Sequence, residues 1–208
     1  MSIGIEHFEV YREPGRFAGW PANYGIWSWD DEIVLGFTVG HMLVKEGLFH
    51  LRDTSRPFTT MQARSLDGGR NWESRPFPGQ TPADRALSAD EHVEQDLWLA
   101  SAMADETCPN RPICHPERID FSVPDFALMA ARAGSVHKTG GTSFFYTSTD
   151  RCRSWEGPYS LPIFGQTGVA ARTDYQILGP RECLLFLSAG KADGTEGQMF
   201  CARTVDGG

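Results

Sequence analysis

The sequence repeats a pair of opposite charges at the start of two predicted strands. Arg118 and Asp120 lie two residues apart, and Arg172 and Asp174 repeat that spacing, each pair being followed by an aromatic residue. Side chains two residues apart in an extended chain point to the same side. Each pair therefore presents a cation and a carboxylate together, either to a ligand or to one another as a salt bridge inside the fold.

An eight-residue turn organises the rest of the chain. Ser65 and Asp67 can accept backbone N–H bonds inside a tight turn, Gly69 supplies a positive φ, and Trp72 is suited to packing between neighbouring sheets. Two partial copies keep the spacing: Ser148, Asp150 and Trp155 with Cys152 at the glycine position, then Thr204, Asp206 and Gly208. The recurrence predicts a structural repeat, with these turn residues structural rather than catalytic. We expect the second turn to resemble the first, with local strain at Cys152.

Each turn closes the same order of predicted elements: strand, tight turn, strand, long polar loop, strand. The predicted strands are Gly25 to Trp29, Ile33 to Val39 and Thr59 to Arg64; Ile119 to Val123, Phe126 to Ala131 and Thr142 to Thr147; and Thr173 to Leu178, Cys183 to Ser188 and Gln198 to Arg203. A fourth strand follows each of the first two turns, near Glu73 to Phe77 and Tyr159 to Phe164. Four antiparallel strands per unit predict an all-β fold, a β-propeller with about three blades present. A content of 12% aromatic residues, 22 Gly and 13 Pro favours the same class.

Two segments fall outside the repeat. Ile5 to Tyr11 alternates apolar and polar residues as a half-buried strand does, and Arg16 to Pro21 is predicted to be a non-repetitive loop. The connection over residues 79–117 is much longer than an ordinary loop. Within it, Ser88 to Glu91 is a capping-box pattern ahead of apolar residues at helical spacing, which predicts a short helix. The helix either packs on the rim of the fold or covers a binding site, and Glu91, His92 and Glu94 are its expected solvated face.

The turn signature and the order of strands resemble the sialidase-like family, whose BNR repeats carry this turn as the Asp-box. The resemblance covers nearly the whole chain and implies a propeller that usually closes with six blades. It therefore implies that residues 1–208 form a single propeller domain, incomplete at its C-terminal end, as the N-terminal half of a longer protein. Ile5 to Tyr11 is then the expected outer strand of the last blade.

The resemblance also implies roles for particular residues. Sialidases bind the substrate carboxylate with a cluster of arginines, to which Arg172 corresponds in position and Arg16, which lies earlier, corresponds less closely. Their general acid is an aspartate on the loop after the second strand of an early blade, and Asp53 is the only aspartate between Gly40 and Phe58. The alternative for Asp53 is a solvated loop carboxylate. The family's Tyr nucleophile and its Glu partner are expected in later blades.

Composition excludes several classes of function. A net charge of −8 argues against nucleic-acid binding, and the sequence contains neither a signal-peptide pattern nor an apolar run long enough to span a membrane. Five cysteines at irregular spacing do not form a disulfide framework, and Cys108, Cys114 and His115 match no common zinc pattern. We therefore expect no metal and no cofactor, and the cellular location stays open.

Two functions remain. The first is a sialidase-like exo-glycosidase that acts on a terminal, acidic sugar through Arg16, Arg118, Asp120, Arg172, Asp174 and Asp53. The second is a non-catalytic propeller that binds glycans or a protein partner, because fold alone does not confer activity.

Overall fold

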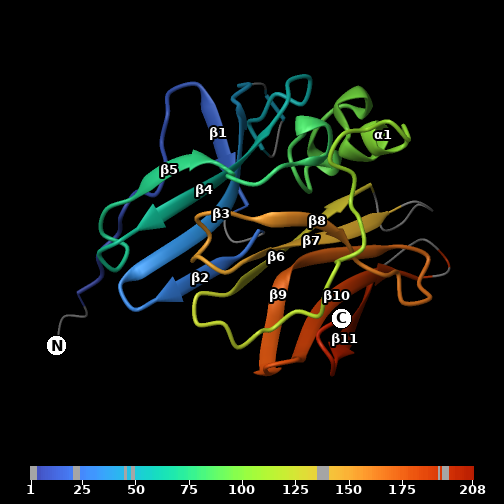
Figure 1. The fold of residues 1–208 in the computed structure, drawn as a ribbon. Coiled ribbons are helices and arrows are strands. Elements are labelled where there is room, and N and C mark those ends of the chain that lie inside the picture. The colour runs from blue at the N-terminus through green and yellow to red at the C-terminus, as the bar shows by residue number, and fades with distance from the viewer. Residues whose placement is uncertain are drawn as a thin grey trace.

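Three antiparallel sheets follow one another along the chain and pack side by side (Figure 1). The computed structural model describes residues 4–20, 24–44, 46–47, 50–134, 141–191, 193 and 197–208. The first sheet contains β1 (Arg16–Gly19), β2 (Ile26–Trp29), β3 (Glu32–His41), β4 (Thr59–Ser65) and β5 (Glu73–Pro76). The second contains β6 (Ala127–Ala133), β7 (Thr142–Ser148) and β8 (Glu156–Ser160), and the third β9 (Val169–Gly179), β10 (Glu182–Gly190) and β11 (Gly197–Thr204). The predicted all-β class is confirmed.

Apolar side chains fill the two spaces between the sheets. The first and second sheets enclose a cluster that includes Trp27, Met129 and Phe144, and the second and third enclose one that includes Leu128, Val169 and Leu187. The helices in the described part of the chain are too short and too polar to cross a membrane.

The first two eight-residue turns share one set of hydrogen bonds. Ser65 Oγ donates to Asp67 Oδ1 (2.9 Å) and accepts from Gly69 N (2.9 Å). In the second turn Ser148 Oγ donates to Asp150 Oδ1 (2.8 Å) and accepts from Cys152 N (3.0 Å). Cys152 adopts φ +61°, the left-handed region that the glycine position requires. The second turn therefore resembles the first, as predicted, and Cys152 has the strained backbone expected at the glycine position.

The first strand of the first sheet is interrupted. Both β1 and β2 pair with β3 on the same edge, β1 opposite Thr38 to His41 and β2 opposite Glu32 to Leu35. The prediction of a loop over Arg16 to Pro21 was wrong for Arg16–Gly19, because the long β3 extends far enough for these residues to pair with it. Pro21 lies outside the described residues.

The N-terminal segment does not form the predicted strand. Residues 5–11 pair with no sheet, and Ile5 is 86% exposed. Only its end is anchored, where Ser74 Oγ donates to Val10 O (3.2 Å) and the ring of Tyr11 lies against Phe37. Alternation alone does not make a strand, because a strand also needs a partner edge.

The second sheet lacks the strand predicted over Ile119 to Val123. Ile119 N donates to Gly207 O (2.7 Å) and Phe121 N donates to Pro180 O (2.8 Å). Both acceptors lie in turns at the end of the third sheet, so the segment joins that sheet's turns rather than β6. The fourth strand also differs, since β8 is Glu156–Ser160 whereas the sequence predicted Tyr159 to Phe164.

Side-chain hydroxyls satisfy the open edge of β6. The three amides and their acceptors are Leu128 N with Tyr175 Oη (3.3 Å), Ala130 N with Thr173 Oγ1 (2.9 Å) and Arg132 N with Ser88 Oγ (3.0 Å). Because two of these hydroxyls come from β9, they join the second sheet to the third without a ladder of backbone bonds.

Replacing Thr173 by valine is expected to destabilise the protein by about 1–3 kcal/mol, because the buried Ala130 amide loses its acceptor while side-chain shape is kept. Urea denaturation and hydrogen exchange at the Ala130 amide measure this. The exposed Thr107→Val serves as control, with a change within about 0.5 kcal/mol. Unchanged exchange at Ala130 would contradict the assignment.

The insertion over residues 79–117 contains short helical turns rather than one helix from Ser88. These are the 3₁₀ turns Pro82–Asp84, Asp90–His92 and Gln95–Leu97, and the helix α1 (Leu99–Met103). The buried Asp90 carboxylate accepts from Leu99 N (2.6 Å), Ala100 N (2.9 Å) and Gly134 N (2.8 Å). Ser88 instead bonds to β6, so Asp90 both caps α1 and ties the insertion to the end of the second sheet.

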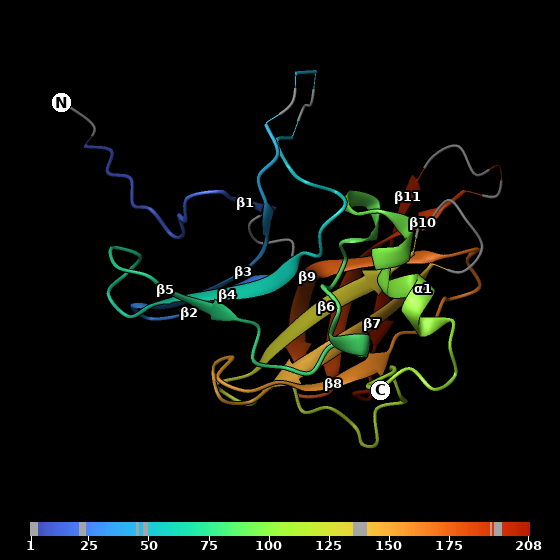
Figure 2. The ribbon, with the colours of Figure 1, turned by 90° about the horizontal axis from the view of Figure 1, so that it is seen from above.

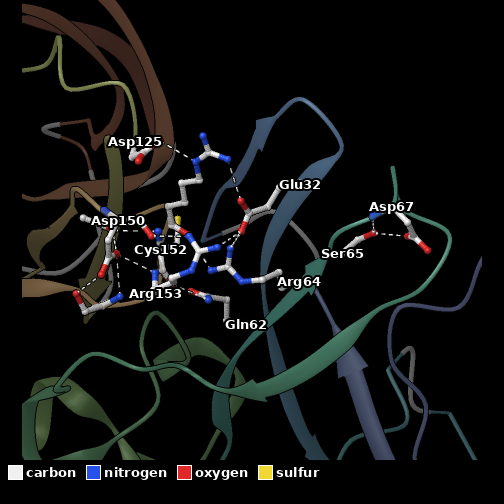
Figure 3. Close-up of polar contacts among 12 residues, drawn as sticks. Glu32, Gln62, Arg64, Ser65, Asp67, Asp125, Asp150, Cys152 and Arg153 are labelled. Atoms are coloured by element: carbon white, nitrogen blue, oxygen red, sulfur yellow. Dashed lines mark hydrogen bonds and ion pairs between the residues drawn. The ribbon is translucent and has the colours of Figure 1, made fainter.

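A buried carboxylate joins the first two sheets near their eight-residue turns. Glu32, at the start of β3, binds Arg64, Arg151 (3.1 Å) and Arg153 (2.9 Å) (Figure 3). Arg151 also binds Asp125 (2.7 Å). Burial alone would raise the pKa of Glu32, but its arginine partners lower it below the ordinary value.

Candidate functional site

The sheets have two different ends. The eight-residue turns follow β4, β7 and β11 at one end, which we term the turn face. At the other end, the loop face, lie the segment after β3, the insertion, the end of β6 and the start of β9. Figure 2 shows residues 50–58 running towards the helical insertion, where Glu94 N donates to Thr54 O (2.9 Å).

An arginine–glutamate pair lies on the loop face, where the insertion meets the end of β6. Arg132, at the end of β6, donates to both carboxylate oxygens of Glu91 in the insertion, at 3.1 and 2.7 Å. The Arg132 side chain is 7% exposed, whereas that of Glu91 is 42% exposed. The hydrogen bond from Arg132 lowers the pKa of Glu91, and the charge of Arg172 acts in the same direction. Glu91 therefore presents an ionised carboxylate to solvent.

Arg172 adds an exposed cation beside this pair. In the described part of the chain it forms no hydrogen bond and no ion pair, and its charge adds to the hydrogen bond from Arg132 in lowering the pKa of Glu91. The strand bulges here. Ala171 pairs with Leu187 and Tyr175 pairs with Leu185, so β9 is longer than β10 between these two pairs. Bulges of this kind re-aim side chains.

An aromatic stack supports the insertion next to Glu91. The ring of Trp20 stacks on His92 with centroids 3.9 Å apart, and Arg52 lies over the same ring. Arg52 Nε also donates to His92 O (3.3 Å). Burial and then the Arg52 charge lower the pKa of His92 to about 4, so its ring is neutral at pH 7. This stack fixes the backbone that carries Glu91.

Asp53 and Arg16 lie together at another part of the loop face. Arg16 Nη1 is 2.8 Å from His41 Nε2, and Asp53 N donates to His41 O (2.9 Å). The Asp53 carboxylate accepts from the Ser55 hydroxyl (2.7 Å) and amide, and these bonds lower its pKa below the ordinary value. Asp53 thus lies away from the turn face, but it favours the ionised form.

The other predicted site residues do not converge with these. Arg118 pairs with Asp206 in the third turn, and Asp120 accepts from the Ser122 hydroxyl (2.6 Å). The first charged pair therefore belongs to the turn face. Asp174 is exposed on β9, two residues nearer the turn face than Arg172.

Sequence reasoning missed Arg132, and it assigned Glu91 and His92 to a solvated helix face. Arg132 lies within an apolar strand pattern, where a buried arginine needs a partner that spacing does not reveal. No group of three or more His, Cys, Asp or Glu side chains among the described residues is placed to hold a metal ion.

Comparison with known proteins supports the fold alone. No protein-family model matches the sequence, and no curated protein matches it. A crystal structure of a protein of unknown function from Dyadobacter fermentans DSM 18053 aligns with a TM-score of 0.56 at 15% identity, over 97% of this chain and 55% of that one. This chain thus spans about half the length of that protein.

Two solved carbohydrate-acting enzymes align more loosely. A GH32 β-fructofuranosidase from Bombyx mori in complex with sucrose aligns with a TM-score of 0.39 at 17% identity, over 85% of this chain and 32% of that one. A β-1,2-mannobiose phosphorylase from Listeria innocua aligns with a TM-score of 0.42 at 13% identity, over 92% and 56%. Likenesses this loose carry no inference about activity.

Proposed function

We propose that the three sheets are blades of a sialidase-like β-propeller and that the loop face binds a carboxylated sugar as part of a glycoside-cleaving enzyme. The observation that carries the proposal is Arg172, an exposed guanidinium whose charge acts on Glu91 of the Arg132–Glu91 pair. Two features support the propeller. The first two turns share one hydrogen-bond pattern, and strands that follow one another in the chain are neighbours in the sheets.

The chemistry suits an anionic sugar. A guanidinium binds a carboxylate through two parallel N–H···O bonds, and such charge-assisted bonds are about twice as strong as neutral ones. Glu91 stays ionised beside it, where it can accept hydrogen bonds from sugar hydroxyls. Together Arg172 and Glu91 can hold the carboxylate and a hydroxyl of one ring.

Arg172→Ala is expected to weaken binding of a carboxylated sugar about 10- to 100-fold, the loss of one or two charge-assisted bonds. Isothermal titration with N-acetylneuraminic acid and with glucuronic acid measures this, and neutral glucose should show no dependence on the variant. Arg75→Ala is the matched control, because Arg75 is also exposed but lies on β5. Equal affinities for wild type and Arg172→Ala would overturn the proposal.

One observation favours a non-catalytic glycan-binding propeller instead. A general acid must hold a proton near neutral pH, yet the pKa values of both Asp53 and Glu91 are lowered. Hydrolysis of aryl sialosides separates the two functions. If Asp53 is the acid, Asp53→Asn lowers kcat and leaves KM nearly unchanged. Sugar binding without turnover on any aryl glycoside would establish the non-catalytic function.

A further inference from the structure

A cavity of about 240 Å³ lies between the loop-face end of the first sheet and the start of the insertion. One wall comes from the start of β4 and the end of β5, and the other comes from the first residues of the insertion. None of the residues assigned above to a carboxylated sugar lines it. The lining residues used below are Thr59, Phe77, Thr81, Asp84, Arg85 and Ala86.

Asp84 contributes a carboxylate that has no protein partner. The residue is exposed, and its side chain forms no hydrogen bond and no ion pair with any residue that the structure describes. Its backbone lies in the left-handed region at φ +55°, as does that of Ala83 at φ +51°, a region that residues other than glycine adopt infrequently. Hydrogen bonds from Ala83 N to Pro109 O (3.1 Å) and from Asp84 N to Thr81 O (3.1 Å) hold this conformation. Strained backbone of this kind is concentrated at sites that bind ligands.

Arg85 adds a guanidinium to the same cavity in a fixed orientation. Its Nη1 donates to Asp96 O and to Trp98 O, both at 2.7 Å. Its Nε and Nη2 have no acceptor within the described ranges of the chain. The cavity therefore offers both hydrogen-bond acceptors and N–H donors, and its two opposite charges give it no preference for an anion or a cation.

Phe77 forms an apolar side of the cavity. The rings of Tyr146 and Trp155 hold it in place, with centroids 5.2 and 5.9 Å from its own. A pyranose ring combines an apolar C–H face, which packs against an aromatic ring, with hydroxyl groups that both donate and accept hydrogen bonds. The cavity is smaller than the roughly 300–1,000 Å³ of sites for drug-sized ligands, so its size suits a single ring.

We propose that this cavity binds an uncharged sugar ring, as a carbohydrate site separate from the one proposed for a carboxylated sugar. The Asp84 carboxylate accepts hydrogen bonds from sugar hydroxyls, the Arg85 guanidinium donates to a sugar oxygen, and the C–H face packs against Phe77. The hydroxyls of Thr59 and Thr81 lie in the same lining and complete its polar part. This site does not depend on the proposed function, because the two sites share no residue.

The test is a titration of the complete chain with the uncharged methyl glycosides of glucose, galactose, mannose and N-acetylglucosamine, followed by amide chemical shifts. Asp84→Asn should weaken binding about 10-fold, because a charge-assisted hydrogen bond is lost. Asparagine suits this position because it also tolerates a positive φ. Asp31→Asn, an exposed residue that precedes β3 at the turn face, is the matched control and should bind as wild type does. No binding of any of the four glycosides, or equal affinities for wild type and Asp84→Asn, would overturn the proposal.

A blocking variant shows where the sugar binds. Ala86→Leu fills the cavity and should abolish binding, whereas the exposed Ala18→Leu on β1 should preserve it. If Ala86→Leu does not fold, the wild-type spectra decide: shifts at the amides of residues 81–86 support the site, and shifts confined to other residues contradict it. Arg172→Ala should bind the uncharged glycosides as wild type does, whatever its affinity for a carboxylated sugar. Loss of their binding in that variant would place the sugar at Arg172 and contradict a separate site.

Discussion

Glu32→Gln is expected to destabilise the protein by about 3 kcal/mol, because it removes the one carboxylate that three arginines share. Glu32 is 8% exposed at the start of β3, and two of its partners, Arg151 and Arg153, belong to the second eight-residue turn. Removing the charge of Glu32 leaves the positive charge of Arg64 without this carboxylate partner, although the Arg64 side chain is only 16% exposed. Chemical denaturation at pH 7 measures the change.

Glu73→Gln on β5 is the control, since Glu73 is exposed and its change should stay within about 0.5 kcal/mol. The Glu32 effect should also depend on pH. The pKa of Glu32 is lowered in the folded protein, so its contribution is complete above the unfolded value of about 4.3 and is lost as pH falls below it. A Glu32→Gln variant as stable as wild type at pH 7 would show that the cluster does not join the sheets.

Trp155→Ala is expected to cost about 4 kcal/mol, within the usual range for removing a buried tryptophan. The indole fills the space between the first two sheets, and its loss leaves Gln62 Oε1 without its donor. Gln62 is 3% exposed, so water does not readily replace that bond. Urea denaturation measures the loss.

The comparison is Trp72→Ala, at the same position of the first turn. Trp72 is only partly buried and donates to Gly69 O (2.8 Å) within its own turn, so its removal should cost about 2 kcal/mol. Equal losses of stability at the two positions would contradict this explanation, in which Trp155 stabilises the protein mainly by packing between the first two sheets and not by bonds within its turn.

The sequence alone determined the eight-residue turns and most strands. Ser65 and Asp67 bond to amides no more than four residues away, so spacing is sufficient to predict the turn. Cys152 takes the glycine conformation because the same local bonds hold it. Strand periodicity likewise predicted β3, β4 and β10, each of which has a neighbouring strand to pair with.

Only the tertiary structure decided which segments pair as strands and which charged side chains form ion pairs. Residues 119–123 have a strand pattern, yet their amides bond to the third sheet's turns, while hydroxyls from β9 and Ser88 cover β6. Glu91 and Arg132 lie 41 residues apart in sequence and meet where Ser88 and Asp90 bond the insertion to the end of β6. Hydrogen bonds within a turn can be predicted from the spacing of residues, whereas contacts between sheets depend on the packing of elements far apart in the chain.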